Sequence, residues 1–175
     1  LHQVMKNEII LVDENDNEIG AGEKLEVHKL GKLHRAFSIF VFSSKKELLI
    51  QKRASAKYHS GGLWSNTCCS HPRPSEDLEI TAHRRLKEEM GIDCDLKEIY
   101  KFVYKIEFEN RLTEHEYNHV LVGRSDDTPV VNPEEAEDWR WIDTRLLRED
   151  VKSYPEKYTY WFKVSLDDVL KRMLN

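Results

Sequence analysis

Two short stretches of this chain hold side chains whose types and spacing suit acid–base chemistry at a metal ion. The first contains Cys69 and His71, and the second contains Glu114 and Glu116. Residues at positions i and i+2 of a β-strand point to the same face, so the members of each pair can aim at one point. A thiol, an imidazole and two carboxylates are groups that bind metals and transfer protons in enzymes. The sequence therefore predicts a metal site with acid–base groups attached to it.

The elements that must position these pairs are predicted from hydrophobic alternation and turn residues. The expected strands are 8–12, 19–25, 35–43, 47–53, 96–108, 112–123 and 137–143. Of these, 35–43 and 47–53 are expected to form a hairpin, and 96–108 and 112–123 are expected to be joined by a turn at 109–111. Between them we expect a helix that starts with Ser75 as its N-cap, runs to Met90 and ends at Gly91. Later helices are expected over 144–151 and within 155–174. This mixed order predicts an α+β fold, with a mixed β-sheet flanked by α-helices.

Composition limits the class of protein. With 175 residues, 39% hydrophobic and 34% charged, we expect a single domain over 1–175 with a buried core. The net charge of −5 and the lack of a basic tract argue against a nucleic-acid partner. No apolar run approaches the about 20 residues that span a membrane, and no signal peptide is visible. Three cysteines, two of them adjacent, do not suit a disulfide framework, so we expect a cytoplasmic protein, and the lack of heptads predicts a monomer.

The helix expected to end at Met90 carries a second motif. Residues 84–92 resemble the end of the Nudix box, and Glu76 falls on the earlier glutamate of that box. Two positions depart from the box, since it has glycine at Ser70 and glutamate at Arg85. The box is a helix that presents carboxylates to Mg²⁺ on a diphosphate. Here Glu89 remains as a metal ligand, while Arg85, four residues earlier on the same face, can bind phosphate instead.

Taken together, these motifs resemble those of the type 1 isopentenyl-diphosphate isomerases, a family with the Nudix fold. The resemblance covers most of the chain. It is carried, in order, by Lys24, His28, 33–38, 51–54, Lys57, 62–72, the altered Nudix helix, Tyr104, 114–116 and Trp161. The resemblance implies an isomerase of isoprenoid biosynthesis that interconverts isopentenyl diphosphate and dimethylallyl diphosphate, transposing a C=C bond.

The resemblance also implies two metal ions. One divalent ion would be bound by His28, His34, His71, Glu114 and Glu116. Three neutral imidazoles and two carboxylates suit Mn²⁺, Zn²⁺ or Fe²⁺ better than Mg²⁺ alone. The second ion, Mg²⁺, would bind Glu89, a backbone carbonyl of Cys69 and the diphosphate of the substrate.

The same resemblance assigns the contacts with this small-molecule substrate. The diphosphate would be bound by Lys24, Arg53, Lys57 and Arg85, with Ser38 as a weaker candidate. Trp161 would present its π face to a cationic intermediate, and an anchoring role for this residue in the last helix is equally compatible with its position.

The reaction adds a proton to C4 of an unactivated alkene and removes one from C2. It needs a donor and an acceptor on opposite faces of the substrate, in a dry pocket. We expect Cys69 and Glu116 to be this pair. Glu116, with Tyr104 as a relay, would protonate C4. Cys69 would remove the C2 proton as a thiolate, if nearby cations lower its pKa.

Other residues of the same types are expected to be structural. Alternation points Cys68 away from Cys69, so Cys68 and Cys94 are expected to be small buried residues. Histidines that are assigned no role include His2, His59, His83 and His115. Of these, His59 lies near Lys57 and could face the substrate.

Two rival functions are considered. A Nudix hydrolase of a nucleoside diphosphate derivative would need the full carboxylate cluster to hold metals and activate water, and Arg85 argues against it. A non-catalytic binding module would not need Cys69, Glu116 and Tyr104 together. Phosphate release distinguishes the hydrolase, and isotope exchange distinguishes the isomerase from the binding module.

Overall fold

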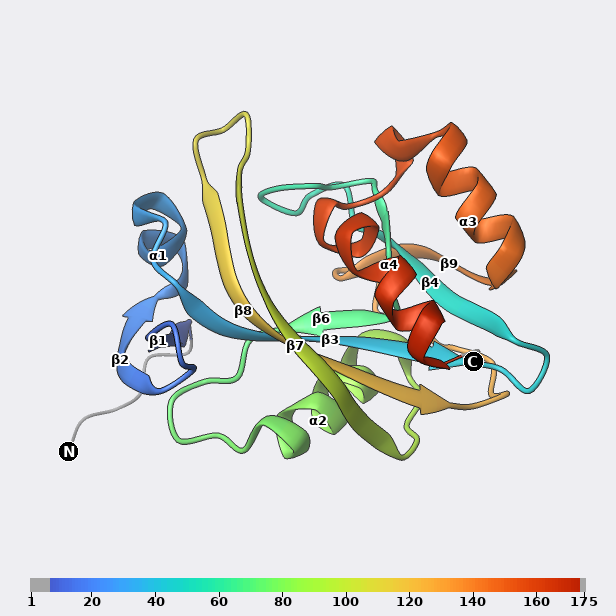
Figure 1. Ribbon diagram of the computed structural model, residues 1–175, viewed down its shortest axis with the longest axis horizontal. Coiled ribbons are helices and arrows are strands. Elements are labelled where there is room, and N and C mark those ends of the chain that lie inside the picture. Colours follow the sequence, from blue (N-terminus) through green and yellow to red (C-terminus); the bar gives the residue numbers. More distant parts are fainter. Residues whose placement is uncertain (1–6, 174–175) are drawn as a thin grey trace.

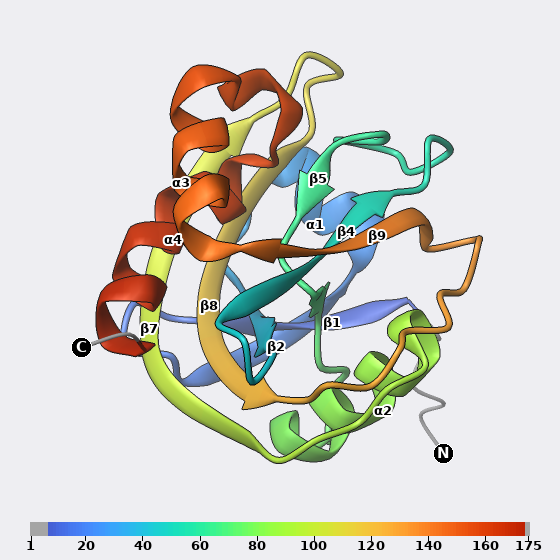
Figure 2. The same ribbon diagram turned by 90° about the vertical axis from the view of Figure 1, so that its right-hand side faces the viewer.

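The computed structural model describes residues 7–173, and within this range nine strands join into one curled mixed sheet (Figures 1 and 2). The strands are β1 (Glu8–Val12), β2 (Glu18–Glu23), β3 (His34–Phe42), β4 (Glu47–Arg53), β5 (Trp64–Ser65), β6 (Cys68–Ser70), β7 (Leu96–Glu107), β8 (Thr113–Arg124) and β9 (Ala136–Asp143). The helices are α1 (Lys24–Leu30), α2 (Leu78–Met90), α3 (Thr144–Ser153), a 3₁₀ turn (Pro155–Lys157) and α4 (Tyr160–Met173). The expected α+β fold is confirmed. Among residues 7–173, none of the helices has the length and apolar character needed to cross a bilayer.

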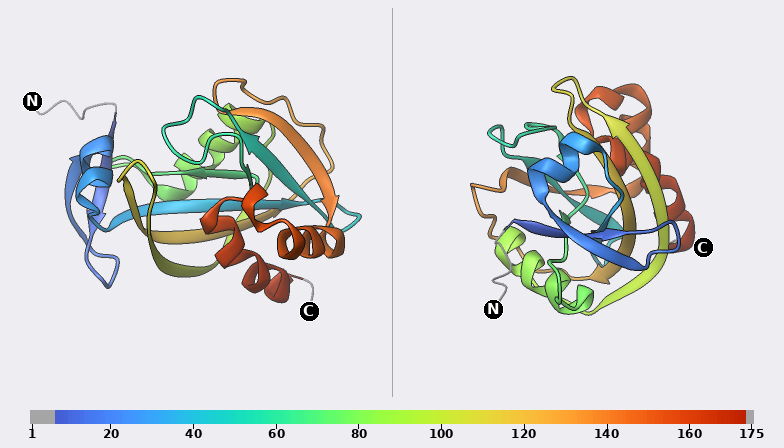
Figure 3. Two further views of the ribbon diagram at one scale, coloured as in Figure 1. Left: turned by 90° about the horizontal axis from the view of Figure 1, so that it is seen from above. Right: turned by 90° about the vertical axis from the view of Figure 1, so that its left-hand side faces the viewer.

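Strand β3 lies at the centre of the sheet. It pairs in parallel with β8, from His34 opposite Glu116 to Phe42 opposite Arg124, and antiparallel with β6. Its alternate side chains enter two hydrophobic cores, with Ile39 packed under α2 and Phe40 packed with α4. The sheet therefore lies between α2 on one face and α3 and α4 on the other, while the β1–β2 hairpin and α1 lie at one end (Figures 1 and 3). Burial on both faces explains the nearly unbroken apolar run of β3.

The expected hairpin of 35–43 with 47–53 forms only next to its turn, and the prediction is wrong for the rest of the two strands. Strands β3 and β4 pair only at Phe42 and Leu48. Because β6 and β8 flank β3 over most of its length, β4 diverges and pairs with β5 and β9 instead. Because β4 diverges from β3, the sheet divides into two halves. Residues from both halves line the site described below.

The expected strand 19–25 ends two residues early, because a helix that was not expected begins at Lys24. The carboxylate of Glu23 caps α1 by accepting N–H bonds from Leu25 at 3.1 Å and Glu26 at 2.9 Å. Gly31 ends the helix with φ of 66°. A helix of seven residues is too short to show a hydrophobic period, so the sequence pattern did not predict it.

The Nudix-like helix α2 is capped by Asp77, not by Ser75. The Asp77 carboxylate accepts from the Ile80 N–H at 3.0 Å, whereas Ser75 takes a left-handed conformation with φ of 68° in the preceding turn. Gly91 ends α2 as expected, with φ of 66°. The long β7–β8 hairpin and its turn at 109–111 are confirmed. The last helix, α4, lies within the expected range, of which residue 174 is outside the described residues.

Candidate active site

A cavity of about 110 Å³ collects most of the predicted site residues at one place. Its wall includes Lys24, Arg53, Lys57, Cys69, His71, Arg85, Glu89, Tyr104, Glu114, Glu116 and Trp161. These residues come from α1, β4, the loop after β4, β6 and the segment directly after it, α2, β7, β8 and α4. His28 and His34 are fully buried beside the cavity, with their ring centroids 5.8 Å and 5.1 Å from that of His71.

The rings of His28 and His34 are held in one tautomer by backbone carbonyls. Nδ1 of His28 donates to the Lys24 carbonyl at 2.6 Å, and Nδ1 of His34 donates to the Lys32 carbonyl at 2.9 Å. A carbonyl can only accept, so Nε2 of each neutral ring keeps its lone pair. Both Nε2 atoms are buried and have no hydrogen-bond partner among the described residues. This is the arrangement by which proteins prepare histidines for a metal.

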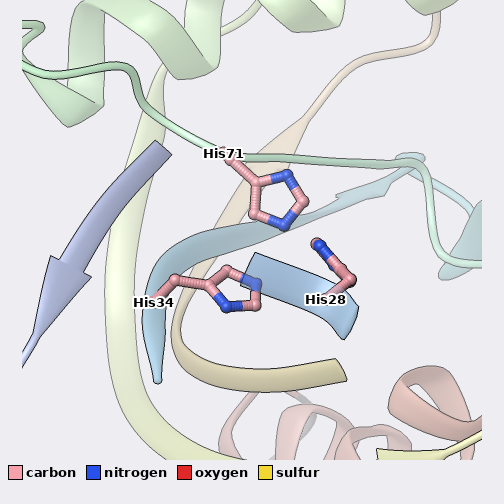
Figure 4. Close-up of side chains that lie close together, drawn as sticks. All are labelled: His28, His34 and His71. Carbon is pink, nitrogen blue, oxygen red and sulfur yellow. The ribbon is translucent and has the colours of Figure 1, made fainter. Parts of the chain in front are cut away.

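The three imidazoles fit a divalent ion. Figure 4 shows the rings of His28, His34 and His71 gathered around a common space. One ligating nitrogen from each lies within 4.8 Å of the others. Burial lowers the pKa of His28 and brings that of His71 to about 3, so both rings are neutral at pH 7. Burial also opposes protonation of His34, but the Glu116 carboxylate outweighs this and raises the pKa of His34, so an ion would have to compete with a proton there. Neutral imidazoles and unpartnered lone pairs are what a transition-metal ion requires.

Two buried carboxylates of β8 complete this cluster. Glu114 and Glu116 stand two residues apart on one face of the strand, and the Tyr104 hydroxyl, from the paired strand β7, donates to both, at 2.7 Å in the case of Glu116. The second oxygen of Glu116 lies 3.1 Å from Nε2 of His71 and 3.7 Å from Nε2 of His34. Burial opposes ionisation of Glu116, but the nearby rings of His34 and His71 hold its pKa well below the usual range. Glu116 therefore links the histidines to the tyrosine.

The two adjacent cysteines point to opposite sides, as alternation predicts. Cys69 faces the cavity, and its thiol donates to Oδ1 of Asn66 at 3.1 Å and lies 3.5 Å from Oγ of Ser38. Cys68 is fully buried in the core under α2, with its Sγ 2.6 Å from a carboxylate oxygen of Glu89. Burial raises the pKa of Cys69 to about 12. The cations around the cavity do not lower it, and Cys69 is a thiol at pH 7.

The four cations expected to bind the diphosphate all line the cavity. Burial, followed by repulsion from Lys57 and Arg53, lowers the pKa of Lys24. This crowding of like charge favours an anionic ligand. Arg53 also places its guanidinium 5.1 Å from the ring centroid of Trp161, which is buried in the core and faces the cavity. Trp161 thus occupies a position that suits both of its expected roles.

Two residues of the cavity were missed by the sequence analysis. Glu135 precedes β9, forms an ion pair with Lys57 and lies 3.2 Å from the Arg85 guanidinium. Burial opposes its charge, but Lys57 outweighs this and brings the pKa of Glu135 to about 2. His59, expected to be structural, has Nε2 3.0 Å from an oxygen of Glu114. Neither residue belongs to a sequence motif, and only the path of the loops brings them here.

The remaining histidines lie elsewhere. His83 pairs with Asp93 at the surface, and Nδ1 of His115 lies 3.2 Å from the Gly31 carbonyl on the opposite face of β8 from Glu114. His119, which was not a candidate, is in contact with Asp16 and Glu98. His2 lies outside the described residues. Cys94 stays away from the cavity, but it lies half-buried near Gly123 and is not the fully buried residue that was expected.

Known proteins resemble this chain in both sequence and structure. Residues 32–162 match the NUDIX domain family. The chain is 54% identical over 172 residues to isopentenyl-diphosphate Delta-isomerase 2 of Aromatoleum aromaticum, covering 98% of this chain and 91% of the relative. It is 51% identical over 163 residues to the isopentenyl-diphosphate Delta-isomerase of Burkholderia multivorans, covering 93% of each.

Solved structures with low sequence identity share the fold. A crystal structure from Deinococcus radiodurans superposes with a TM-score of 0.75 at 18% identity, covering 96% of this chain and 99% of the other. The MutT protein of Methanosarcina mazei gives a TM-score of 0.66 at 14% identity, covering 80% and 94%. With its domain match and its close relatives, this chain is a member of the Nudix superfamily and, within it, of the isopentenyl-diphosphate Delta-isomerase family.

Proposed function

We propose that this protein is an isomerase that interconverts isopentenyl diphosphate and dimethylallyl diphosphate. The observation that carries the proposal is the cavity in which the Cys69 thiol and the Glu116–Tyr104 pair meet, next to a cluster of lysines and arginines. Allylic transposition of this substrate needs two proton-transfer groups and positively charged residues that bind the diphosphate. This cavity contains both. The names of the relatives, at 54% identity over nearly the whole chain, point to the same reaction.

Each catalytic group has one task in this proposal. Tyr104, a phenol whose pKa burial raises far above its usual value, donates to Glu116 and can pass a proton between that carboxylate and C4. Cys69 exchanges the proton at C2. Its thiol form suits donation to C2 in the reverse direction, and the forward direction requires the thiolate. We therefore expect the substrate complex to lower the Cys69 pKa. Trp161 and the buried wall exclude water, which would capture a carbocation.

The metal ions would act by charge and position. The residues that would hold the first ion are His28, His34, His71, Glu114 and Glu116, and Glu89 would bind Mg²⁺. When bound, the first ion supplies positive charge that fixes the two carboxylates of β8. Lys24, Arg53, Lys57 and Arg85 would orient the diphosphate, whose charge Mg²⁺ would partly neutralise when bound. Within the same proposal we expect Mn²⁺ or Zn²⁺ at the first site. A single domain, a monomer and a cytoplasmic location stay predictions.

The proposal is tested by incubating the purified protein with isopentenyl diphosphate and Mg²⁺ and measuring both isomer conversion and phosphate release. We expect conversion to a mixture of the two isomers with no release of inorganic phosphate. Phosphate release without isomerisation would support the Nudix hydrolase alternative. Binding without either change would support a non-catalytic module.

Removing His71 is expected to weaken the first metal site. In His71→Ala one of the three imidazoles is lost. His28 and His34 cannot shift to compensate, because hydrogen bonds to backbone carbonyls fix their rings. We expect Mn²⁺ or Zn²⁺ affinity to fall by at least about tenfold, measured by chelator competition. His83→Ala, at the surface, is the matched control. Unchanged affinity in His71→Ala would refute the ligand assignment.

Alkylation of Cys69 in the metal-free protein is expected to depend steeply on pH. Only the thiolate reacts, and with a pKa raised to about 12 by burial the thiolate fraction grows about tenfold per pH unit through the neutral range. Iodoacetamide modification of the 68–69 peptide, followed by tandem mass spectrometry between pH 7 and 10, should therefore keep rising. A plateau above about pH 9 would show an ordinary thiol, whose pKa is about 8.5.

A further inference from the structure

We propose that His59 is a further ligand of the divalent ion at the histidine–glutamate cluster. The inference rests on the metal site proposed above and adds a residue to it. His59 lies in the loop between β4 and β5, outside every motif that the sequence analysis used. Its side chain is 4% exposed, and it faces the cavity rather than solvent.

The distances around His59 are those of metal ligands. Nε2 of His59, Nε2 of His28 and one oxygen of Glu114 lie within 4.8 Å of one another. With bonds of about 2.1 Å, neighbouring ligand atoms of an octahedron lie about 3.0 Å apart and opposite ones about 4.2 Å. The His59–Glu114 distance is 3.0 Å and the His28–Glu114 distance is 4.0 Å. His59 thus approaches this carboxylate more closely than His28 does.

His28 belongs to two groups of possible ligands, one with His34 and His71 and the other with His59 and Glu114. One nitrogen of His28 cannot serve two ions. The atoms of the two groups do not all lie within 4.8 Å of one another, so a single ion would have to draw His59 and the other ligands together as it binds. With Glu116, the set has four imidazoles and two carboxylates. Six such donors fill an octahedral shell, the geometry that Mn²⁺ favours.

The ring of His59 is fixed in orientation before any ion binds. It stacks on Phe108 with centroids 4.4 Å apart and planes 9° apart, and its edge meets Trp161 at 5.7 Å. Its backbone carbonyl accepts from Arg53 at 3.3 Å. Nδ1 lies 3.2 Å from the Ser60 hydroxyl, which can accept its proton and leave the Nε2 lone pair for the ion. The loop therefore holds this ring as backbone carbonyls hold His28 and His34.

The experiment uses ¹¹³Cd²⁺ as the probe metal in the full chain with ¹⁵N-labelled histidine. A directly bonded nitrogen is split by scalar coupling to ¹¹³Cd, whereas a nitrogen that only donates a hydrogen bond to Glu114 is not. We expect four split histidine rings in the wild-type protein and three in His59→Gln, with Cd²⁺ affinity at least about tenfold lower in the variant. His115→Gln, a substitution outside the cavity, should keep four split rings.

Three split rings in the wild-type protein would overturn the proposal, and this reading needs no variant to fold. Four rings that persist in His59→Gln would also overturn it, because another histidine would then be the fourth ligand. Loss of every split ring in the wild-type protein would instead contradict the metal site itself, so the two failures can be told apart.

Discussion

Cys69→Ala is expected to lower the rate of isomerisation by at least about 10³-fold, in the upper part of the range for losing a positioned acid–base group. The thiol faces the cavity and has no other group of its kind nearby, since Cys68 points into the core under α2. Fold and metal content should not change, because Cys69 contributes only its sulfur to the wall. The measurement is the initial rate of dimethylallyl diphosphate formation, together with circular dichroism and metal analysis of the same preparation.

Two other cysteines provide controls for this result. Cys94→Ala removes a half-buried thiol away from the cavity and should leave the rate unchanged. Cys68→Ala should keep most of the activity, although it removes the S–H donor from Glu89 and leaves a small void. If Cys68→Ala abolished the reaction and Cys69→Ala did not, the alternation of β6 would be assigned to the wrong face.

Glu116→Gln is expected to lower isomerisation by a similar factor, at least about 10³-fold, and to weaken the first metal site as well. The carboxylate accepts from Tyr104 at 2.7 Å and from the Asn118 amide at 3.0 Å, and its other oxygen lies 3.1 Å from His71. An amide keeps the shape but loses the negative charge that both proton transfer and metal binding need. Rates and chelator competition on the same samples would measure the two losses.

Glu107→Gln is the matched control for this variant. It exchanges the same two residue types, but at an exposed position at the end of β7 and outside the cavity. Wild-type metal affinity and rate in Glu116→Gln would contradict the proposed role of the carboxylate. A loss of metal affinity with an unchanged rate would show that Glu116 binds the ion and does not transfer protons.

Local sequence patterns predicted the parts of the fold that such patterns determine. The β7–β8 hairpin follows from two long alternating strands around a polar turn, and the end of α2 follows from Gly91, although its N-cap is Asp77 and not the expected Ser75. The parallel pairing of β3 with β8 joins residues about 80 positions apart, from His34 opposite Glu116 onward, and no local pattern specifies it. The β3–β4 hairpin was expected because strands that are adjacent in the sequence usually pair. It is wrong beyond one residue pair, because β6 and β8 flank β3 instead.

The candidate site divides in the same way. Cys69, His71, Glu114 and Glu116 were predicted from i, i+2 spacing and family motifs, and the structure brings them to one cavity. His59 and Glu135 lie in or beside loops whose course depends on tertiary packing, so their arrival at Glu114 and Lys57 could not be predicted from spacing. The high pKa of Cys69 has the same origin, since it is caused by burial, which a motif does not reveal.

The central claim is that this cavity moves protons on a homoallylic diphosphate. It is tested most directly by incubating the protein with isopentenyl diphosphate and Mg²⁺ in D₂O and recording proton NMR spectra. We expect dimethylallyl diphosphate with deuterium in a methyl group, derived from C4, and further exchange at C2 as the reaction reverses. Unlabelled, unconverted substrate from a metal-loaded preparation would contradict it.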